Sequence, residues 1–385
     1  MRPLRIAFLT EYDARDINRW SGTAYFMSQS LAQRGFDVEY VGPLQERFQL
    51  YIRSLNYFYK HFTRRRYFPF ASPMRLKSFA FQARRRLEGL NYDVVVAPNM
   101  WGIAYLRIEK PVVLWADCTF GSMVDFYPDY TNLCARSLRE GHRAEFKALQ
   151  GCSLAVFASE WAAESAIGYY NVPKEKVKVV PYGANIICSR RLEDIERMIE
   201  SRLRCCCKLL FIGKVWQRKG GEIAVEVAKE LNRRGLETEL ALVGSLPDNA
   251  DKLPAFIKPL GFIDKSKQKG KEQLERLFSE SHFLIVPSRA EAYGIVFCEA
   301  SSYGVPSIAT DVGGIPTVVK EGVNGKRFSL TASVEEYASY IYSIMNNYDE
   351  YKKLAISSFI EYETRLNWKV ASERFGQLIT DLVKL

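Results

Sequence analysis

Short apolar runs alternate with longer helix-like stretches almost throughout the chain, and this alternation limits the possible folds more than any other feature. It is typical of parallel sheets covered by helices on both faces. The predicted strands of the first half are Arg5–Thr10, Asp37–Val41, Asp93–Ala97, Pro111–Trp115, Leu154–Ala158 and Val177–Val180. Those of the second half are Lys208–Gly213, Glu239–Val243, Ile257–Leu260, Phe283–Val286 and Ser307–Ala309. The sequence therefore predicts an α/β protein with two such sheets.

The length of 385 residues exceeds what one hydrophobic core usually supports, so we expect two domains. The first is predicted to span residues 1–185. A charged stretch without strand character, residues 186–207, is expected to link it to the second domain at 208–366. Residues 367–385 form an amphipathic pattern that predicts a final helix, which we expect to cross back to the first domain.

The net charge of +10 favours anionic partners, which include nucleotides, phospholipid head groups, nucleic acid and acidic glycans. The longest apolar runs have the length of strands, so no transmembrane helix is predicted. Polar Glu11, Asp13 and Arg15 end the first apolar run too early for a signal peptide, and we expect a cytoplasmic protein. The cysteines lack C-x-x-C spacing, so reduced structural thiols are expected, including those at 205–207.

The most informative motif is the segment 287–300, which follows a predicted strand and opens a helix. Glu291 and Glu299 stand eight positions apart on either side of Gly294, so both can face one ligand along the start of the helix. One carboxylate can bind sugar hydroxyls and the other a ribose diol. The glycine allows a close backbone approach, and the N–H groups that follow can bind phosphate. Tyr293 and Ile295, on either side of this glycine, are also predicted to contact the donor. The alternative is two solvated glutamates beside a core helix.

A second motif, residues 211–221, also joins a predicted strand to a helix and carries Lys214 and Lys219 five positions apart. Fixed cations at this place can stabilise a departing diphosphate, whose negative charge grows as a glycosidic bond breaks. The alternative for either lysine alone is an exposed side chain near a helix start.

Together the two motifs resemble those of the retaining glycosyltransferases of family 4, also called group 1. The resemblance implies that Glu291 contacts the sugar and Glu299 the ribose. Lys219 matches the lysine of the family pattern G-R-x-x-x-x-K-G, whereas Lys214 replaces its arginine and keeps only the charge. Weaker similarities cover most of the second half in the expected order, and they assign donor contacts to Gly244, Phe262 and Ile263 and turns to 180–185 and 312–316.

In the first half of the chain, fewer positions correspond to motifs of the family. Gly22 stands between the first strand and the first helix, where family members carry a glycine loop facing the diphosphate. Asp117 follows the strand at Pro111–Trp115, where many relatives have a histidine near the transferred sugar. An aspartate there can bind a sugar hydroxyl or share developing positive charge, so we assign Asp117 a catalytic role beside Lys219 and Glu291, with helix capping as the alternative.

The resemblance implies the GT-B architecture, in which two Rossmann-like domains face each other across an interdomain cleft that holds the active site. The expected reaction moves a hexose from a nucleotide sugar, with UDP preferred, to a glycan or lipid-linked acceptor with retention of configuration. The sequence contains no Asp-x-Asp, so no divalent metal or other cofactor is expected, and nucleic acid is not an expected partner. Three alternatives remain: a phosphorylase of the same architecture, a dehydrogenase, and a non-enzymatic basic module that binds glycan or nucleic acid.

Residues 47–87 contain no Asp or Glu but carry two arginine triplets, Arg64–Arg66 and Arg84–Arg86, and many aromatic residues. Basic residues attract an anionic surface, and aromatic rings settle at the level of lipid head groups. This composition suits a peripheral enzyme at the inner face of a membrane. A solvated helical insertion whose aromatic residues pack inward, and a groove for an acidic glycan, are the alternatives.

Overall fold

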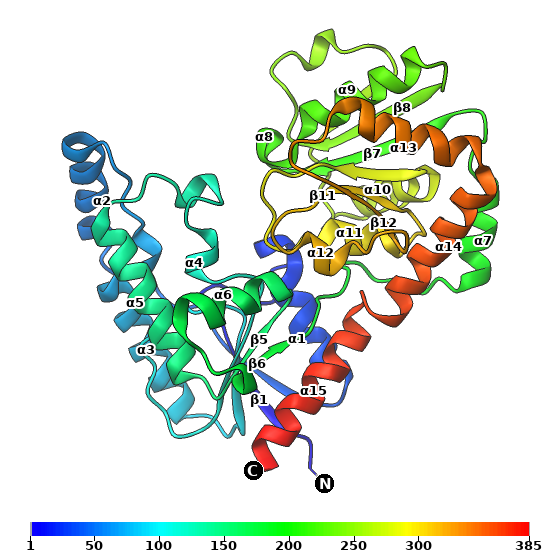
Figure 1. Cartoon of the computed structure of the whole chain (residues 1–385). Helices are drawn as coiled ribbons and strands as arrows, with labels where there is room; N and C mark the ends of the chain where they lie inside the picture. The colour runs from blue at the N-terminus through cyan, green and yellow to red at the C-terminus, as the bar shows by residue number, and fades with distance from the viewer. Residues whose placement is uncertain (1, 385) are drawn as a thin grey trace. The chain divides into compact units, whose positions relative to one another are not determined.

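The computed structural model describes residues 2–384, which fold as two units (Figure 1). The first unit comprises the chain up to Pro181 together with the part from Trp368 onward, and the second runs from Tyr182 to Asn367. Among the described residues, each unit contains one six-stranded sheet, and every strand pairing is parallel. The predicted fold class, α/β with two Rossmann-like domains, is confirmed.

The first sheet has the order β2-β1-β3-β4-β5-β6. Its strands are β1 (Arg5–Leu9), β2 (Asp37–Val41), β3 (Val94–Ala97), β4 (Val112–Ala116), β5 (Leu154–Phe157) and β6 (Val177–Val179). The helices of this unit are α1 (Thr23–Gln33), α2 (Gln49–Phe58), α3 (Pro73–Glu88), α4 (Phe120–Met123), α5 (Ala135–Gly151), α6 (Glu160–Tyr170) and α15 (Trp368–Lys384), with shorter turns η1 (Arg19–Gly22), η2 (Tyr59–Thr63), η3 (Pro69–Ala71), η4 (Pro128–Tyr130) and η5 (Lys174–Lys176). The strand order reverses at β1, and ligands of such sheets bind outside the carboxyl ends at this point.

The second sheet has the order β12-β11-β10-β7-β8-β9. Its strands are β7 (Cys207–Gly213), β8 (Thr238–Gly244), β9 (Ile257–Gly261), β10 (Phe283–Val286), β11 (Ser307–Thr310) and β12 (Gly325–Phe328). The helices are α7 (Leu192–Ser201), α8 (Trp216–Lys219), α9 (Gly221–Arg233), α10 (Gln268–Glu280), α11 (Ile295–Ser301), α12 (Ile315–Val318), α13 (Val334–Asn346) and α14 (Tyr348–Thr364), with η6 (Ala250–Lys252). Here the order reverses at β7, so the loops after β7 and β10 meet at the same edge.

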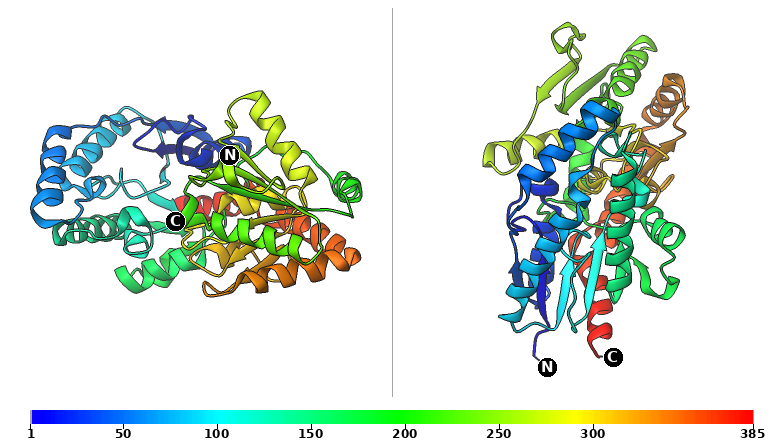
Figure 2. Two further views of the ribbon diagram at one scale, coloured as in Figure 1. Left: turned by 90° about the horizontal axis from the view of Figure 1, so that it is seen from above. Right: turned by 90° about the vertical axis from the view of Figure 1, so that its left-hand side faces the viewer.

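The final helix α15 packs within the first unit, along its sheet (Figure 2). The ring of Phe375 stacks on that of Trp115 from β4 with centroids 4.0 Å apart, and the ring of Trp368 meets the same tryptophan edge-on at 5.9 Å. All three side chains are buried. This C-terminal helix therefore contributes to the core of the first unit, whose other residues lie before Tyr182 in the sequence.

The charged stretch 186–207, which we expected to link the domains, lies within the second unit. Its helix α7 buries Ile195 and Ile199. After it, the buried Arg202 donates hydrogen bonds to the carbonyls of Gly304 and Tyr303, at 2.9 and 2.7 Å. The charges that suggested a linker occupy the exposed face of an amphipathic helix, while its other face joins the core.

Candidate active site

The loop after β10 carries the first predicted motif, and Gly294 ends it in a left-handed conformation, with φ of 93°. A β-carbon at this position would lie 2.6 Å from the ring of Phe297, so a larger residue would have to displace that ring. Gly294 precedes the first residue of α11, Ile295, and no side chain caps this helix. The loop therefore turns sharply and presents backbone rather than a side chain at Gly294.

Lys219 and Glu291 form an ion pair through Nζ and Oε2, which joins the two predicted motifs. Both side chains are nearly buried, with exposed fractions of 11% and 9%. Arg218 Nη1 lies 3.6 Å from the same carboxylate oxygen. Two cations thus share one buried carboxylate, which leaves a net positive charge where the loops after β7 and β10 meet.

Backbone contacts hold these two loops together. Gly220, with φ of 72°, packs so closely on the next loop that a β-carbon would lie 2.2 Å from the carbonyl oxygen of Pro287. Arg289 N donates to Arg218 O at 2.8 Å, and Arg218 Nη1 donates to Ala290 O at 2.7 Å. The Lys219–Glu291 pair is therefore positioned by the main chain as well as by its own charges.

Glu299 lies on α11, eight residues after Glu291, and its Oε1 atom is buried without a hydrogen bond from any residue in the described part of the chain. Lys265 Nζ lies 3.5 Å from this oxygen. Burial raises the pKa of the Glu299 carboxyl, and the charges of Lys265 and Lys214 act against that rise. A buried carboxylate oxygen with one long contact to a lysine can still accept a hydrogen bond from a ligand hydroxyl.

The predicted nucleoside contacts lie at the ends of β8 and β9. Gly244, with φ of 102°, would place a β-carbon 2.2 Å from Gly213 O, and Ser245 N donates to the same carbonyl at 2.7 Å. Phe262 is 69% exposed, whereas its neighbour Ile263 is buried. At the carboxyl end of these strands, the glycine at 244 lets the backbone pack closely, and the ring of Phe262 is accessible to a ligand.

Tyr293 does not present its side chain to this site. Its hydroxyl donates to Tyr182 O at 2.7 Å, and its ring meets that of Tyr182 edge-on with centroids 5.2 Å apart. Burial holds the pKa of the Tyr293 phenol well above its usual range. The side chain of this tyrosine supports the loop from the core side, so a donor contact of Tyr293 would have to use its backbone.

Gly22 and Asp117 belong to the first unit, after β1 and β4 respectively. Gly22 follows two residues with positive φ, Trp20 at 46° and Ser21 at 56°. Left-handed backbone at non-glycine residues is costly and clusters at functional sites. Asp117 lies close enough to Tyr12 for its charge to contribute to the raised pKa of that phenol, although burial is the larger cause.

Sequence reasoning missed two cations of the site, Arg218 and Lys265. Arg218 directly precedes Lys219 on the four-residue helix α8, so its proximity to Glu291 was available from the motif itself. Lys265 follows the segment already assigned to the nucleobase, but its approach to Glu299 depends on how the loop after β9 folds back. The sequence gives no periodic signal for that turn.

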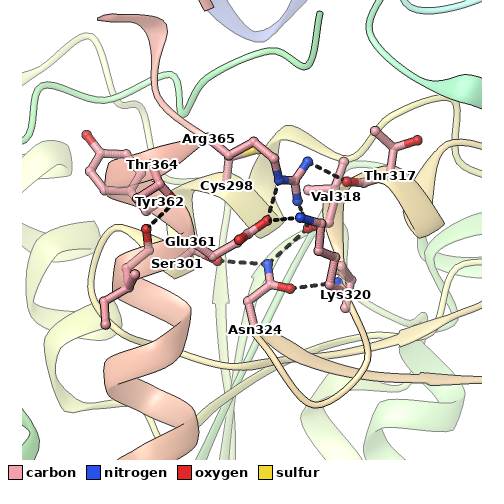
Figure 3. Close-up of polar contacts among 12 residues, drawn as sticks. Cys298, Ser301, Thr317, Val318, Lys320, Asn324, Glu361, Tyr362, Thr364 and Arg365 are labelled. Carbon is pink, nitrogen blue, oxygen red and sulfur yellow. Dashed lines mark hydrogen bonds and ion pairs between the residues drawn. The ribbon is translucent and has the colours of Figure 1, made fainter. Parts of the chain in front are cut away.

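A network of polar contacts supports the site from α14 (Figure 3). Arg365 donates to the carbonyls of Thr317 and Val318 at the end of α12, at 2.6 and 3.3 Å, and pairs with the buried Glu361. At the other end of α12, Gly314 N donates to Glu291 O at 3.0 Å. The short helix α12 therefore connects this network to the backbone of Glu291.

Two family models match successive parts of the chain. The model described as "Glycosyltransferase Family 4" matches residues 23–186, and the model described as "Glycosyl transferases group 1" matches residues 206–347. The second match contains Lys219, Glu291 and Glu299.

One curated relative is similar to this chain in sequence, and two solved structures are similar to it in fold. A D-inositol 3-phosphate glycosyltransferase of Paenarthrobacter aurescens is 24% identical over 194 residues, which are 49% of this chain and 48% of that protein. The chain thus spans about half the length of this curated relative. Sucrose-phosphate synthase of Thermosynechococcus elongatus has a TM-score of 0.68 at 16% identity, covering 98% of this chain and 99% of the other. HepE of Anabaena, solved in complex with UDP and glucose, has a TM-score of 0.61 at 16% identity and the same coverages.

Proposed function

We propose that this chain, which belongs to glycosyltransferase family 4, transfers a hexose from a UDP-sugar to a glycan or lipid-linked acceptor. The observation that carries the proposal is the pair formed by Lys219 and Glu291, buried beside Arg218 where two loops of the second sheet meet. The complex of HepE with UDP and glucose supports the choice of donor.

In the proposed donor complex, Glu299 accepts hydrogen bonds from the ribose diol, since its buried Oε1 has no such bond within residues 2–384. The exposed ring of Phe262 and the backbone at Ile263 lie at the end of β9, where we place the base. Glu291 accepts from sugar hydroxyls, and Lys219 then turns from the carboxylate to the diphosphate. The ion pair keeps both groups ordered until the donor arrives.

The proposed reaction breaks the bond between the anomeric carbon and the UDP oxygen and forms a bond from that carbon to the acceptor oxygen on the same face. The acceptor proton passes to an oxygen of the departing diphosphate, so no side chain need act as base. Negative charge increases on the diphosphate in the transition state, and Lys219, Arg218 and Lys214 offset it. We propose that these cations take the place of a divalent metal.

Gly22 and Asp117 complete the proposal in the first unit. The left-handed backbone from Trp20 to Gly22 leads into α1, an 11-residue helix with no side-chain cap, whose first N–H groups can bind diphosphate oxygens. Asp117 is proposed to stabilise positive charge at the anomeric carbon or to bind a sugar hydroxyl.

We expect UDP and one UDP-sugar to raise the thermal stability of the purified protein in a panel of nucleotides and nucleotide sugars. A ligand at a hundred times its dissociation constant adds about 2.7 kcal/mol to the free energy of unfolding. Glu299→Gln should weaken UDP binding on the order of tenfold, because hydrogen bonds to a charged acceptor are lost. Glu272→Gln, an exposed glutamate on α10, is the matched control. If no nucleotide stabilises the wild-type protein, the proposed function is wrong.

We also expect transfer to persist in excess EDTA and to give a product with the donor's anomeric configuration. Both follow from a leaving group stabilised by the chain's own cations and an attack on the face that UDP leaves. Transfer is measured with and without the chelator, and proton NMR of fresh product gives the configuration. Abolition by EDTA with recovery on adding Mg²⁺ or Mn²⁺ contradicts the metal-free mechanism, and inversion contradicts same-face attack.

A further inference from the structure

Residues 47–66, here called the aromatic segment, form a surface that the rest of the first unit does not cover. The segment contains α2 and η2, and neither element has a buried residue. The following residues behave differently, since α3 buries Leu76 and Phe79 in the core. The aromatic residues of the second part are divided, since Tyr67, Phe68 and Phe79 are buried whereas Phe70 and Phe81 are exposed. Inward packing therefore describes only some of the aromatic residues of 67–87 and does not describe α2 and η2.

The aromatic segment exposes several large apolar side chains. Leu50 is 82% exposed, Phe62 73% and Tyr57 64%. Leu50 and Tyr57 are seven residues apart, which is close to two helical turns, so they share one face of α2. Phe58 stacks on Phe62 with ring centroids 5.2 Å apart, which continues an apolar surface into η2. A contiguous exposed surface of this kind marks a binding site for a protein or a membrane.

Basic residues lie beside this apolar face. Arg53 and Lys60 are both exposed and also seven residues apart, and the exposed Arg64 directly follows η2. Within residues 2–384 no carboxylate forms an ion pair with any of these three cations. Because residues 47–87 contain no Asp or Glu, the aromatic segment carries basic residues and no acidic ones. Its charge is therefore complementary to an anionic partner.

Contacts with Arg136, Tyr67 and Asn132 attach the aromatic segment to the rest of the first unit, while its apolar face remains exposed. Arg136 Nη2 of α5 donates to the hydroxyl of Tyr51 at 2.9 Å, and the ring of Tyr59 stacks on buried Tyr67 at 5.8 Å. Arg66 N donates to Asn132 O at 2.9 Å. In Figure 1, α2 lies at the outer end of the first unit next to α5.

We propose that the aromatic segment docks this protein on an anionic lipid membrane. Leu50, Tyr57 and Phe62 enter the boundary between head groups and acyl chains, while Arg53, Lys60 and Arg64 lie against lipid phosphates. Exposed aliphatic and aromatic side chains beside cations favour a lipid surface over an acidic polymer, which would not cover the apolar face. Among residues 2–384, we find no helix with the length and hydropathy of a membrane-spanning segment.

Vesicle cosedimentation tests this proposal without donor or acceptor, so its outcome is independent of the proposed activity. The vesicles are phosphatidylcholine alone or with about one third phosphatidylglycerol, at low and high salt. Arg53→Ser with Lys60→Ser should weaken binding to anionic vesicles on the order of thirtyfold at low salt, and the difference should shrink at high salt. Leu50→Ser with Phe62→Ser should weaken it at least about tenfold at either salt concentration.

Ile187→Ser with Lys271→Ser is the matched control, because it removes one exposed apolar side chain and one exposed cation from the second unit. It should bind like wild type, and circular dichroism should show all variants folded. Three results overturn the proposal: no wild-type binding to anionic vesicles at low salt, unchanged binding after Leu50→Ser with Phe62→Ser, or a dimer by light scattering that this pair of changes dissociates.

Discussion

Lys219→Ala is expected to lower kcat roughly a hundredfold, the usual cost of removing one preorganised charge partner of a transition state. Lys219 is proposed to offset the charge that appears on the diphosphate as the glycosidic bond breaks. The substitution also removes one of the two cations beside buried Glu291, but Arg218 Nη1 remains 3.6 Å from that carboxylate. The fold should therefore persist, and steady-state kinetics of the purified variant measure the effect.

Lys252→Ala is the control for this experiment, since Lys252 is an exposed lysine of the same unit that lies outside both motifs. It should retain wild-type kinetics. Near-wild-type kcat for a folded Lys219→Ala protein would show that the buried ion pair is only structural. A rise in KM with unchanged kcat would place Lys219 in donor binding instead of transition-state stabilisation.

Arg365→Met is expected to lower the free energy of unfolding by about 3 kcal/mol, near the lower end for removal of one partner from a buried ion pair. The guanidinium bonds Thr317 O and Val318 O and pairs with buried Glu361 (Figure 3). For a unit of this size the melting temperature should fall by roughly 6–12 °C. Differential scanning calorimetry of the purified variant gives the value.

Lys320→Met provides the contrast, because Lys320 Nζ pairs with the same Glu361 carboxylate at 3.0 Å but is 47% exposed. An exposed partner contributes little, so this change should cost less than about 1 kcal/mol. Equal losses from the two substitutions would contradict the role given to burial. A loss below about 1 kcal/mol for Arg365→Met would show that α12 does not depend on this arginine.

Most of the strands were predictable because parallel strands covered on both faces form uniformly apolar runs, as Val94–Val96 and Phe283–Val286 do. β12 was missed because its residues Gly325–Phe328 include Lys326 and Arg327. It is an edge strand, paired in parallel with β11. Its extended conformation therefore depends on hydrogen bonds to that neighbour and not on its own apolar pattern. A β-carbon at Gly325 would lie 2.0 Å from the carbonyl oxygen of Ser307, the residue with which Gly325 pairs.

The central residues of the candidate site were predictable because motif position fixes them at the ends of two adjacent strands. Lys219 follows β7 and Glu291 follows β10, and these strands pair directly. The direction of Tyr293 was not predictable from the motif, since it depends on the carbonyl of Tyr182, which is distant in sequence. The division of residues 47–87 into exposed elements and the core helix α3 also depends on contacts with residues distant in sequence, so the sequence alone did not predict it.

Release of UDP from a UDP-sugar is the measurement that most directly tests the proposed transfer reaction. The purified protein is incubated in EDTA with the donor that stabilises it most, with and without an extract of lipids and glycans, and UDP and glycosylated products are quantified by mass spectrometry. We expect release of UDP that the extract accelerates, with one hexose added to an acceptor and a rate roughly a hundredfold lower in Lys219→Ala. No UDP release from any UDP-sugar with any extract, or equal rates in wild type and Lys219→Ala, would contradict this expectation.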